Sequence, residues 1–138
     1  MDLQKAKDLL SKEGYTCVLV QGQAVFTSRE RGVKPLLNWL EEGCVLPGFS
    51  AADKVVGKAT AYLYCLLVAK AVHAGVMSDA AMAVFQEYGI SATCDRQVDY
   101  IRNRTSTGMC PMEEATWNIR TPEEAPAAIR EKLRQLNS

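Results

Sequence analysis

The residues with the clearest chemical potential form one short segment, between positions 102 and 114. Cys110 comes directly before Pro111, and two glutamates follow at positions 113 and 114. Proline is favoured at the first helical position because its missing N–H would have no partner there, and acidic side chains in the first turn suit the positive end of the helix dipole. We therefore predict that Cys110 is the N-cap of a helix, where free backbone N–H groups and the dipole stabilise a thiolate.

The loop before this helix carries groups that suit an anionic ligand. Asn103 and Arg104 are followed by three hydroxyl residues and Gly108. A guanidinium group binds phosphate in a bidentate manner, and hydroxyls and backbone N–H groups add further donors. The segment predicts that Asn103, Arg104 and Gly108 contact a phosphate or a ribose. The alternative is a solvated loop with Arg104 in a surface ion pair.

Two roles are open for the pair formed by Cys110 and Glu113. Cys110 is either an activated thiol, with Glu113 moving protons, or part of the wall of an anion site. The alternative is that Glu113 is the second half of a capping box, in which its carboxylate accepts a hydrogen bond from the N-cap N–H. The sequence places no histidine near Cys110 to act as a base, which weakens the case for a covalent nucleophile.

A second group of candidates lies between positions 53 and 58. A helix that begins near Asp53 would place Lys58 just past its first turn, where lysine and free N–H groups converge on an anion. Gly57 lowers helix propensity but permits a close approach. The alternative to ligand binding is that Asp53 is a helix cap and Lys58 a surface lysine. Arg31 and Lys34 are either further ligand contacts or the polar face of a helix.

Composition restricts the class of protein. The 138 residues suit a single domain, 1–138, with 48% hydrophobic and 23% charged residues. Sixteen basic residues balance sixteen acidic ones, so no overall field attracts nucleic acid or an anionic membrane. The longest apolar run, 59–69, is shorter than the ~20 residues of a membrane span. Five cysteines without a CxxC pair, and no apolar leader, predict a cytoplasmic location.

Periodicity and end signals predict a layered α/β protein with a mixed sheet. Trp39, Trp117 and His73 are interpreted as structural, with His73 near the end of a helix. Another helix is expected to contain Pro35 in its first turn and to end at Gly43. The remaining helices are expected at 2–12, 53–73, 79–88 and 126–136, and the strands at 15–20, 24–28, 76–77, 90–93 and 98–101.

Three blocks, 31–37, 52–59 and 103–113, resemble an uncharacterised prokaryotic family that is catalogued as a domain of unknown function with a cytidine-deaminase-like fold. The resemblance implies a three-layer α/β/α sandwich. True deaminases place H-x-E at one helix start and P-C-x-x-C at another. Here the first position resembles Val56-Gly57-Lys58-Ala59, without ligand or acid, and the second resembles Cys110-Pro111-Met112-Glu113, with one cysteine replaced by glutamate. Zinc needs three protein ligands for hydrolytic work, so neither a metal nor another cofactor is expected.

The functional hypothesis is a small binding protein for an anionic, nucleotide-like ligand such as ADP-ribose. Asp53, Gly57, Lys58, Asn103, Arg104, Gly108 and Cys110 would form its site. One alternative is a metal-independent enzyme that uses Cys110 or Lys58 covalently. Another is a non-catalytic interaction module, and the resemblance adds the expectation of a homodimer.

Overall fold

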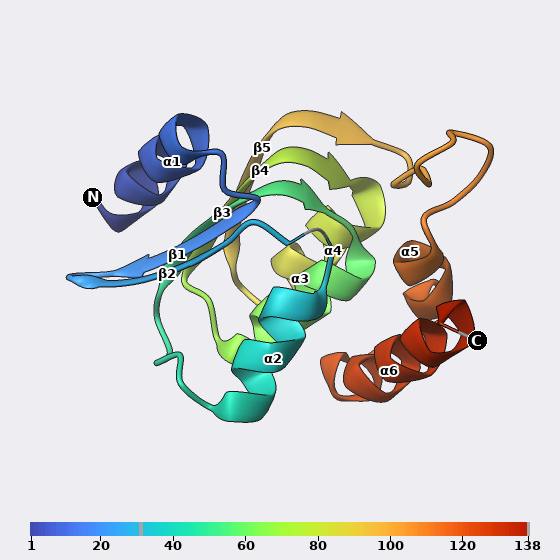
Figure 1. Ribbon diagram of the computed structural model, residues 1–138. Helices are drawn as coiled ribbons and strands as arrows, with labels where there is room; N and C mark the ends of the chain where they lie inside the picture. Colours follow the sequence, from blue (N-terminus) through green and yellow to red (C-terminus); the bar gives the residue numbers. More distant parts are fainter. Residues whose placement is uncertain (31, 138) are drawn as a thin grey trace.

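The computed structural model describes residues 1–30 and 32–137 and forms an open α/β layer structure (Figure 1). Arg31, one of the candidates above, lies outside the described residues. The helices are α1 (Asp2–Glu13), α2 (Lys34–Glu42), α3 (Lys58–Leu67), α4 (Asp79–Glu87), α5 (Pro111–Thr116), the 3₁₀ turn η1 (Pro122–Glu124) and α6 (Ala125–Leu136). The strands are β1 (Cys17–Gln21), β2 (Ala24–Ser28), β3 (Ser50–Val56), β4 (Ala71–Ser78) and β5 (Ser91–Val98).

The five strands form one mixed sheet in the order β2-β1-β3-β4-β5. The hairpin β1–β2 is antiparallel, and β1 also pairs antiparallel with β3, with Cys17 opposite Asp53. Strands β3, β4 and β5 are parallel. Their carboxyl ends therefore meet at one edge of the sheet, which is where open α/β sheets bind ligands.

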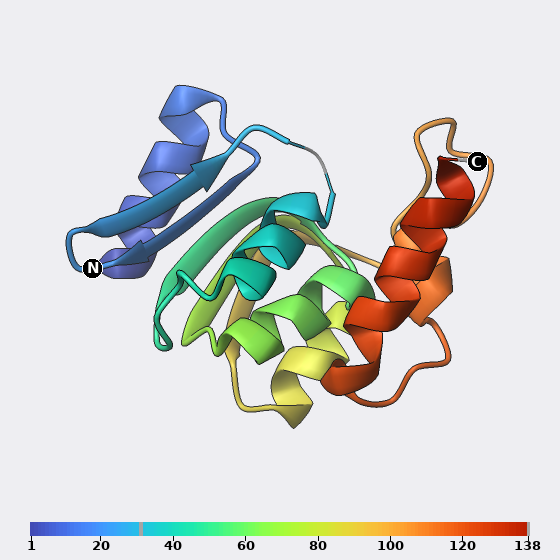
Figure 2. The same cartoon turned by 60° about the horizontal axis from the view of Figure 1, so that its bottom comes forward.

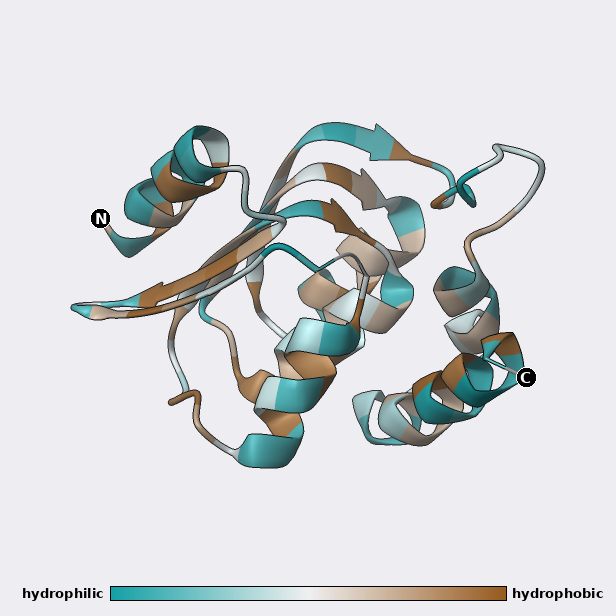
Figure 3. Ribbon diagram, in the orientation of Figure 1, coloured by the Kyte–Doolittle hydropathy of each residue, from teal (hydrophilic) through white to brown (hydrophobic). Residues whose placement is uncertain are grey.

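Helices cover the two faces of the sheet unequally (Figure 2). Helix α1 lies alone on one face, over a small apolar cluster formed by Ala6, Val18, Val20 and Ala52. The other face carries α2, α3 and α4 over the main core, and α5 and α6 continue this layer beside α3. Figure 3 shows brown, apolar segments in β1, β3 and β4, whereas the edge strand β5 is largely teal. The predicted three-layer α/β/α arrangement is therefore confirmed.

Several predicted elements are confirmed because their ends carry local signals. Gly14 and Gly43 end α1 and α2 in the left-handed conformation, with φ of 71° and 67°. Ser78 caps α4, since its hydroxyl accepts a hydrogen bond from the Ala81 N–H at 3.1 Å. The β-hairpin and the helix that ends at Leu136 also form.

The predicted helix 53–73 forms only over Lys58–Leu67, so both of its predicted ends are wrong. Asp53 lies in strand β3 and is no helix cap, Lys58 is the first residue of α3, and His73 lies in strand β4, where its Nδ1 is 2.8 Å from the Thr93 hydroxyl. The two strands directly flank the apolar helix and are themselves mostly apolar, so periodicity did not separate them from a single buried helix. Helix α3 ends without glycine, at Val68 with φ of 63°.

The predicted strand 98–101 does not form either. Strand β5 begins at Ser91 and continues to Val98, and the chain then turns through Asp99 and Tyr100. Beyond that turn Arg102 makes an isolated bridge with Met109. Among the described residues, no helix combines the length and apolar character that crossing a bilayer requires.

Candidate functional site

A cavity of about 670 Å³ opens at the carboxyl end of β3. Its walls come from four segments of the sequence: Thr16 just before β1, the connection from β2 to α2, the end of β3 with the start of α3, and the loop that leads into α5 with the first turn of that helix. Asp53, Gly57, Asn103, Arg104 and Cys110 all line it. The structure therefore brings together five of the seven ligand-binding candidates.

Lys58 and Gly108 are the two exceptions, since neither lines the cavity. The Lys58 ammonium donates a hydrogen bond to the Trp117 carbonyl at 2.9 Å and lies 5.6 Å from the centre of the Tyr62 ring. Desolvation of this amine lowers the pKa of Lys58. Gly108 instead stabilises the loop itself, since its carbonyl accepts a hydrogen bond from the Asn103 N–H at 2.9 Å.

Glu113 joins the segments that form the cavity. Its side chain is buried, and Oε1 accepts the Lys58 N–H at 2.6 Å while Oε2 accepts the Ile101 N–H at 2.7 Å. The Ser78 hydroxyl donates to Oε1 at 3.3 Å. One carboxylate thus links α5 to the start of α3, to the loop and to the end of β4.

The same contacts correct the predicted capping box. The Cys110 N–H donates to the Ile101 carbonyl at 2.7 Å and not to Glu113. Gly57 has to be small here, because a Cβ at this position would lie 3.0 Å from Glu113 Oε1. The anion position at the start of α3 is therefore occupied in part by the protein's own carboxylate.

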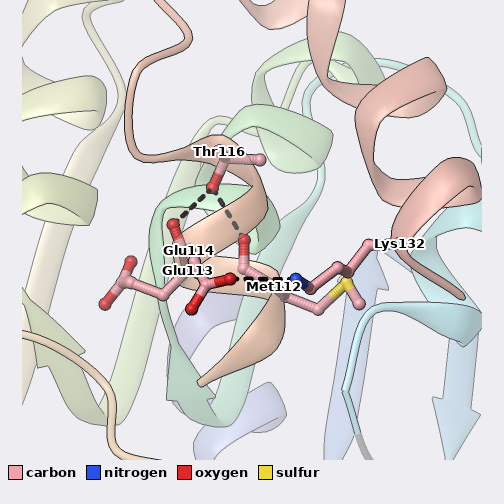
Figure 4. A network of polar contacts seen from close by, with 5 residues as sticks. All are labelled: Met112, Glu113, Glu114, Thr116 and Lys132. Atoms are coloured by element: carbon pink, nitrogen blue, oxygen red, sulfur yellow. Dashed lines mark hydrogen bonds and ion pairs between the residues drawn. The ribbon is translucent and has the colours of Figure 1, made fainter. Parts of the chain in front are cut away.

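Polar contacts within helix α5 and one ion pair to α6 hold this short helix in place (Figure 4). The Thr116 hydroxyl donates to the Met112 carbonyl at 2.9 Å and lies 3.4 Å from that of Glu113. Glu114 pairs with Lys132 of α6 at 3.0 Å. Cys110 is the N-cap of α5, as predicted, but its side chain caps no N–H group.

Asp53 is a buried polar residue of the cavity wall. The residue is 8% exposed, and its Oδ2 accepts the Tyr64 hydroxyl at 2.7 Å. The Cys17 sulfur lies 3.2 Å from the same hydroxyl. Burial raises the pKa of Asp53 to about 6, an effect that the hydrogen bonds from Tyr64 and from the Val55 N–H partly offset. Burial also raises the pKa values of Cys17 and Tyr64 well above their usual range.

Three exposed arginines line the cavity. They are Arg29, Arg102 and Arg104. Arg29 stacks on the Tyr15 ring at 4.6 Å, and Arg102 on the Tyr100 ring at 4.8 Å. None of the three makes an ion pair with any residue that the structure describes. Lys54 also borders the cavity, but strand alternation directs its side chain toward the α1 face, where it lines a second hollow with Lys7 and Ser11.

Sequence reasoning missed Arg29, which lies in a connection with no motif of its own. Of the residues interpreted as structural, Trp39 packs edge-on against Phe26 at 5.8 Å, whereas Trp117 is 43% exposed. Within the described chain, no group of three or more His, Cys, Asp or Glu side chains could hold a metal ion.

The fold and the cavity define an α/β protein with an open mixed sheet and a ligand-sized cavity at the ends of its parallel strands. The chain belongs to the TM1506 family, described as a domain of unknown function (DUF1893), which matches residues 5–133. A DUF1893 family protein (TM1506) from Thermotoga maritima has a similar structure, with a TM-score of 0.87 and 27% sequence identity. The match covers 95% of this chain and 89% of that one. No curated protein matches the chain in sequence.

Proposed function

We propose that this protein binds a nucleotide or a nucleotide-derived anion, such as ADP-ribose, in the cavity at the end of β3. One observation carries the proposal. Three arginines without ion-pair partners among the described residues line a cavity whose wall also holds the buried carboxyl of Asp53. Phosphate groups suit such cations, and the hydroxyls or amino groups of a nucleoside suit the carboxyl.

The dimensions of the cavity support the same class of ligand. A volume of about 670 Å³ lies within the range of small-molecule sites, about 300–1,000 Å³. The N-terminal residues Ala59 and Thr60 of α3 line the cavity and add the positive end of a helix dipole. The arginines of the loop are better placed than the Lys58 ammonium, which is engaged by Trp117.

We further propose that the fold is of the cytidine-deaminase type. In that comparison, the segments 56–59 and 110–113 occupy the two helix starts that carry the metal site of true deaminases. The 2.6 Å bond between Glu113 and the Lys58 N–H joins these two helix starts. Glu113 would thus fill the space between them with a carboxylate of the protein.

The binding proposal is tested by calorimetric titration with ADP-ribose, ADP and pyrophosphate. We expect Arg104→Ala to weaken the binding of all three about tenfold, since one charge-assisted phosphate contact is lost. Arg96→Ala is the matched control, because Arg96 is an exposed arginine of β5 that does not line the cavity. Absence of binding by all three ligands, or equal losses in both variants, would contradict the proposal.

The same ligands allow a test of Cys110. If the protein is an enzyme, Cys110 is a better candidate than Lys58 for the covalent residue, because Cys110 lines the cavity and Lys58 does not. Bound ADP is expected to slow alkylation of the half-buried Cys110 and to leave exposed Cys44 unchanged. A covalent role further predicts a mass increase confined to Cys110 after incubation with ADP-ribose. If ADP left the alkylation rate of Cys110 unchanged, as it should that of Cys44, the ligand would bind elsewhere.

A further inference from the structure

The Asp53 carboxyl receives one short hydrogen bond from the protein, and its other contacts are long or weak. Its Oδ2 accepts the Tyr64 hydroxyl at 2.7 Å and Oδ1 accepts the Val55 N–H at 3.4 Å, while the Cys17 thiol and the Lys54 N–H are weaker donors to the same carboxyl. Each carboxylate oxygen can accept two hydrogen bonds. Since Asp53 lines the cavity while only 8% of the residue is exposed, the remaining capacity is available to a molecule inside the cavity.

The surroundings of Asp53 do not neutralise it. Tyr64 and Cys17, its polar side-chain neighbours, are hydrogen-bond donors without positive charge, and Asp53 makes no ion pair with a described lysine or arginine. Buried charges in proteins are generally paired or bound to a ligand. Buried carboxyls with perturbed titration cluster at functional sites, and the raised pKa of Asp53 agrees with this geometry.

We propose that Asp53 determines the specificity of the cavity by accepting a hydrogen bond from a neutral donor of the nucleoside, either the ribose 2′-hydroxyl or the amino group of the base. This inference rests on the proposed binding of a nucleotide. It also sets the orientation of the ligand, because a phosphate would be repelled by the buried carboxyl and attracted by Arg104 and the other arginines of the cavity. The nucleoside enters the cavity first, and the phosphates remain among the cations.

The test compares ADP, 2′-deoxy-ADP, inosine diphosphate and pyrophosphate by calorimetric titration. For Asp53→Asn we expect ADP to bind about tenfold to a hundredfold more weakly, and pyrophosphate to bind as it does to the wild-type protein. Arg104→Ala should weaken both. The analogue that lacks the recognised donor should bind the wild-type protein weakly and lose little more in Asp53→Asn.

The outcomes separate the two proposals. If ADP binds Asp53→Asn as tightly as the wild-type protein, the role of Asp53 is wrong and nucleotide binding stands. If neither ADP nor pyrophosphate binds the wild-type protein, both proposals are wrong. The analogue measurements need no variant: equal wild-type affinities for ADP, 2′-deoxy-ADP and inosine diphosphate would overturn the role of Asp53 even if Asp53→Asn failed to fold.

Discussion

Asp53 relates binding to stability at the scale of a single residue. Its carboxyl is buried against Tyr64 and Cys17, and burial raises its pKa from 3.8 to about 6. A group whose pKa is higher in the folded than in the unfolded state contributes stability that is complete below the unfolded value. That contribution is lost as the pH rises through the folded value. Ionised Asp53 therefore destabilises the fold near neutral pH, which is a common property of functional residues.

Replacing Asp53 by Asn is expected to change the pH dependence of stability. The amide oxygen can still accept the Tyr64 hydroxyl, and the ionisation is removed. Relative to the wild-type protein, the free energy of unfolding of Asp53→Asn should increase by about 2 kcal/mol between about pH 4.5 and about pH 7.5. Urea denaturation at a series of pH values measures this difference. Asp8→Asn, an exposed aspartate of α1, serves as the control and should leave the profile unchanged. Parallel profiles for Asp53→Asn and wild type would contradict the prediction.

At the scale of elements, Glu113 explains how a short helix can complete the cavity. Helix α5 has only six residues, and its carboxylate reaches the backbone of two other segments. Charge-assisted hydrogen bonds to N–H groups are about twice as strong as neutral ones. The loop 101–110 and the start of α3 are thus held together by α5.

Glu113→Gln tests this connection. Glutamine offers one oxygen, so its NH₂ group would face either the Lys58 or the Ile101 N–H and leave a buried donor without a partner. We expect the free energy of unfolding to fall by about 2–3 kcal/mol. Glu114→Gln, which removes only the largely exposed partner of Lys132, should cost less than about 1 kcal/mol. Urea denaturation compares the two variants, and equal losses would show that Glu113 is not the connecting group.

The elements that the sequence predicted correctly are those with signals at their ends. Gly14, Gly43 and Ser78 mark boundaries by backbone geometry or side-chain capping, and α1, α2 and α4 form as expected. The boundaries between β3, α3 and β4 were missed because the three elements follow one another closely and are all mostly apolar. This error placed Asp53 in a helix cap.

The candidate site was predictable in its loop but not in its connections. Proline after Cys110 and glutamate at position 113 correctly indicated a helix start. The partners of Glu113 are not local, since Lys58 is 55 residues away in the sequence and Ile101 is 12 residues away. Spacing within one helix predicts a capping box equally well. Only the fold shows that the carboxylate points to other segments.

At the scale of the whole molecule, the cavity and the arginines that line it lie on one side of the sheet. The net charge is zero, so the attraction of an anion depends on the three arginines that line the cavity and not on an overall field. The cavity lies at the ends of the parallel strands, whereas α1 covers the opposite face of the sheet over a separate apolar cluster. Ligand binding should therefore affect one part of the molecule strongly and α1 weakly.

Hydrogen exchange with and without saturating ADP tests this distribution. Amides in 53–60 and 101–110 that exchange through local opening of the cavity should be protected, up to about a hundredfold when ADP is present at about a hundred times its dissociation constant. Amides near the ends of α1 exchange by fraying on the opposite face and should keep their rates. Arg104→Ala at the same ADP concentration is the control and should show less protection in both segments. Equal protection of α1 and of 101–110 would mean that the ligand stabilises the fold from another site, and the cavity at the end of β3 would lose its assigned role.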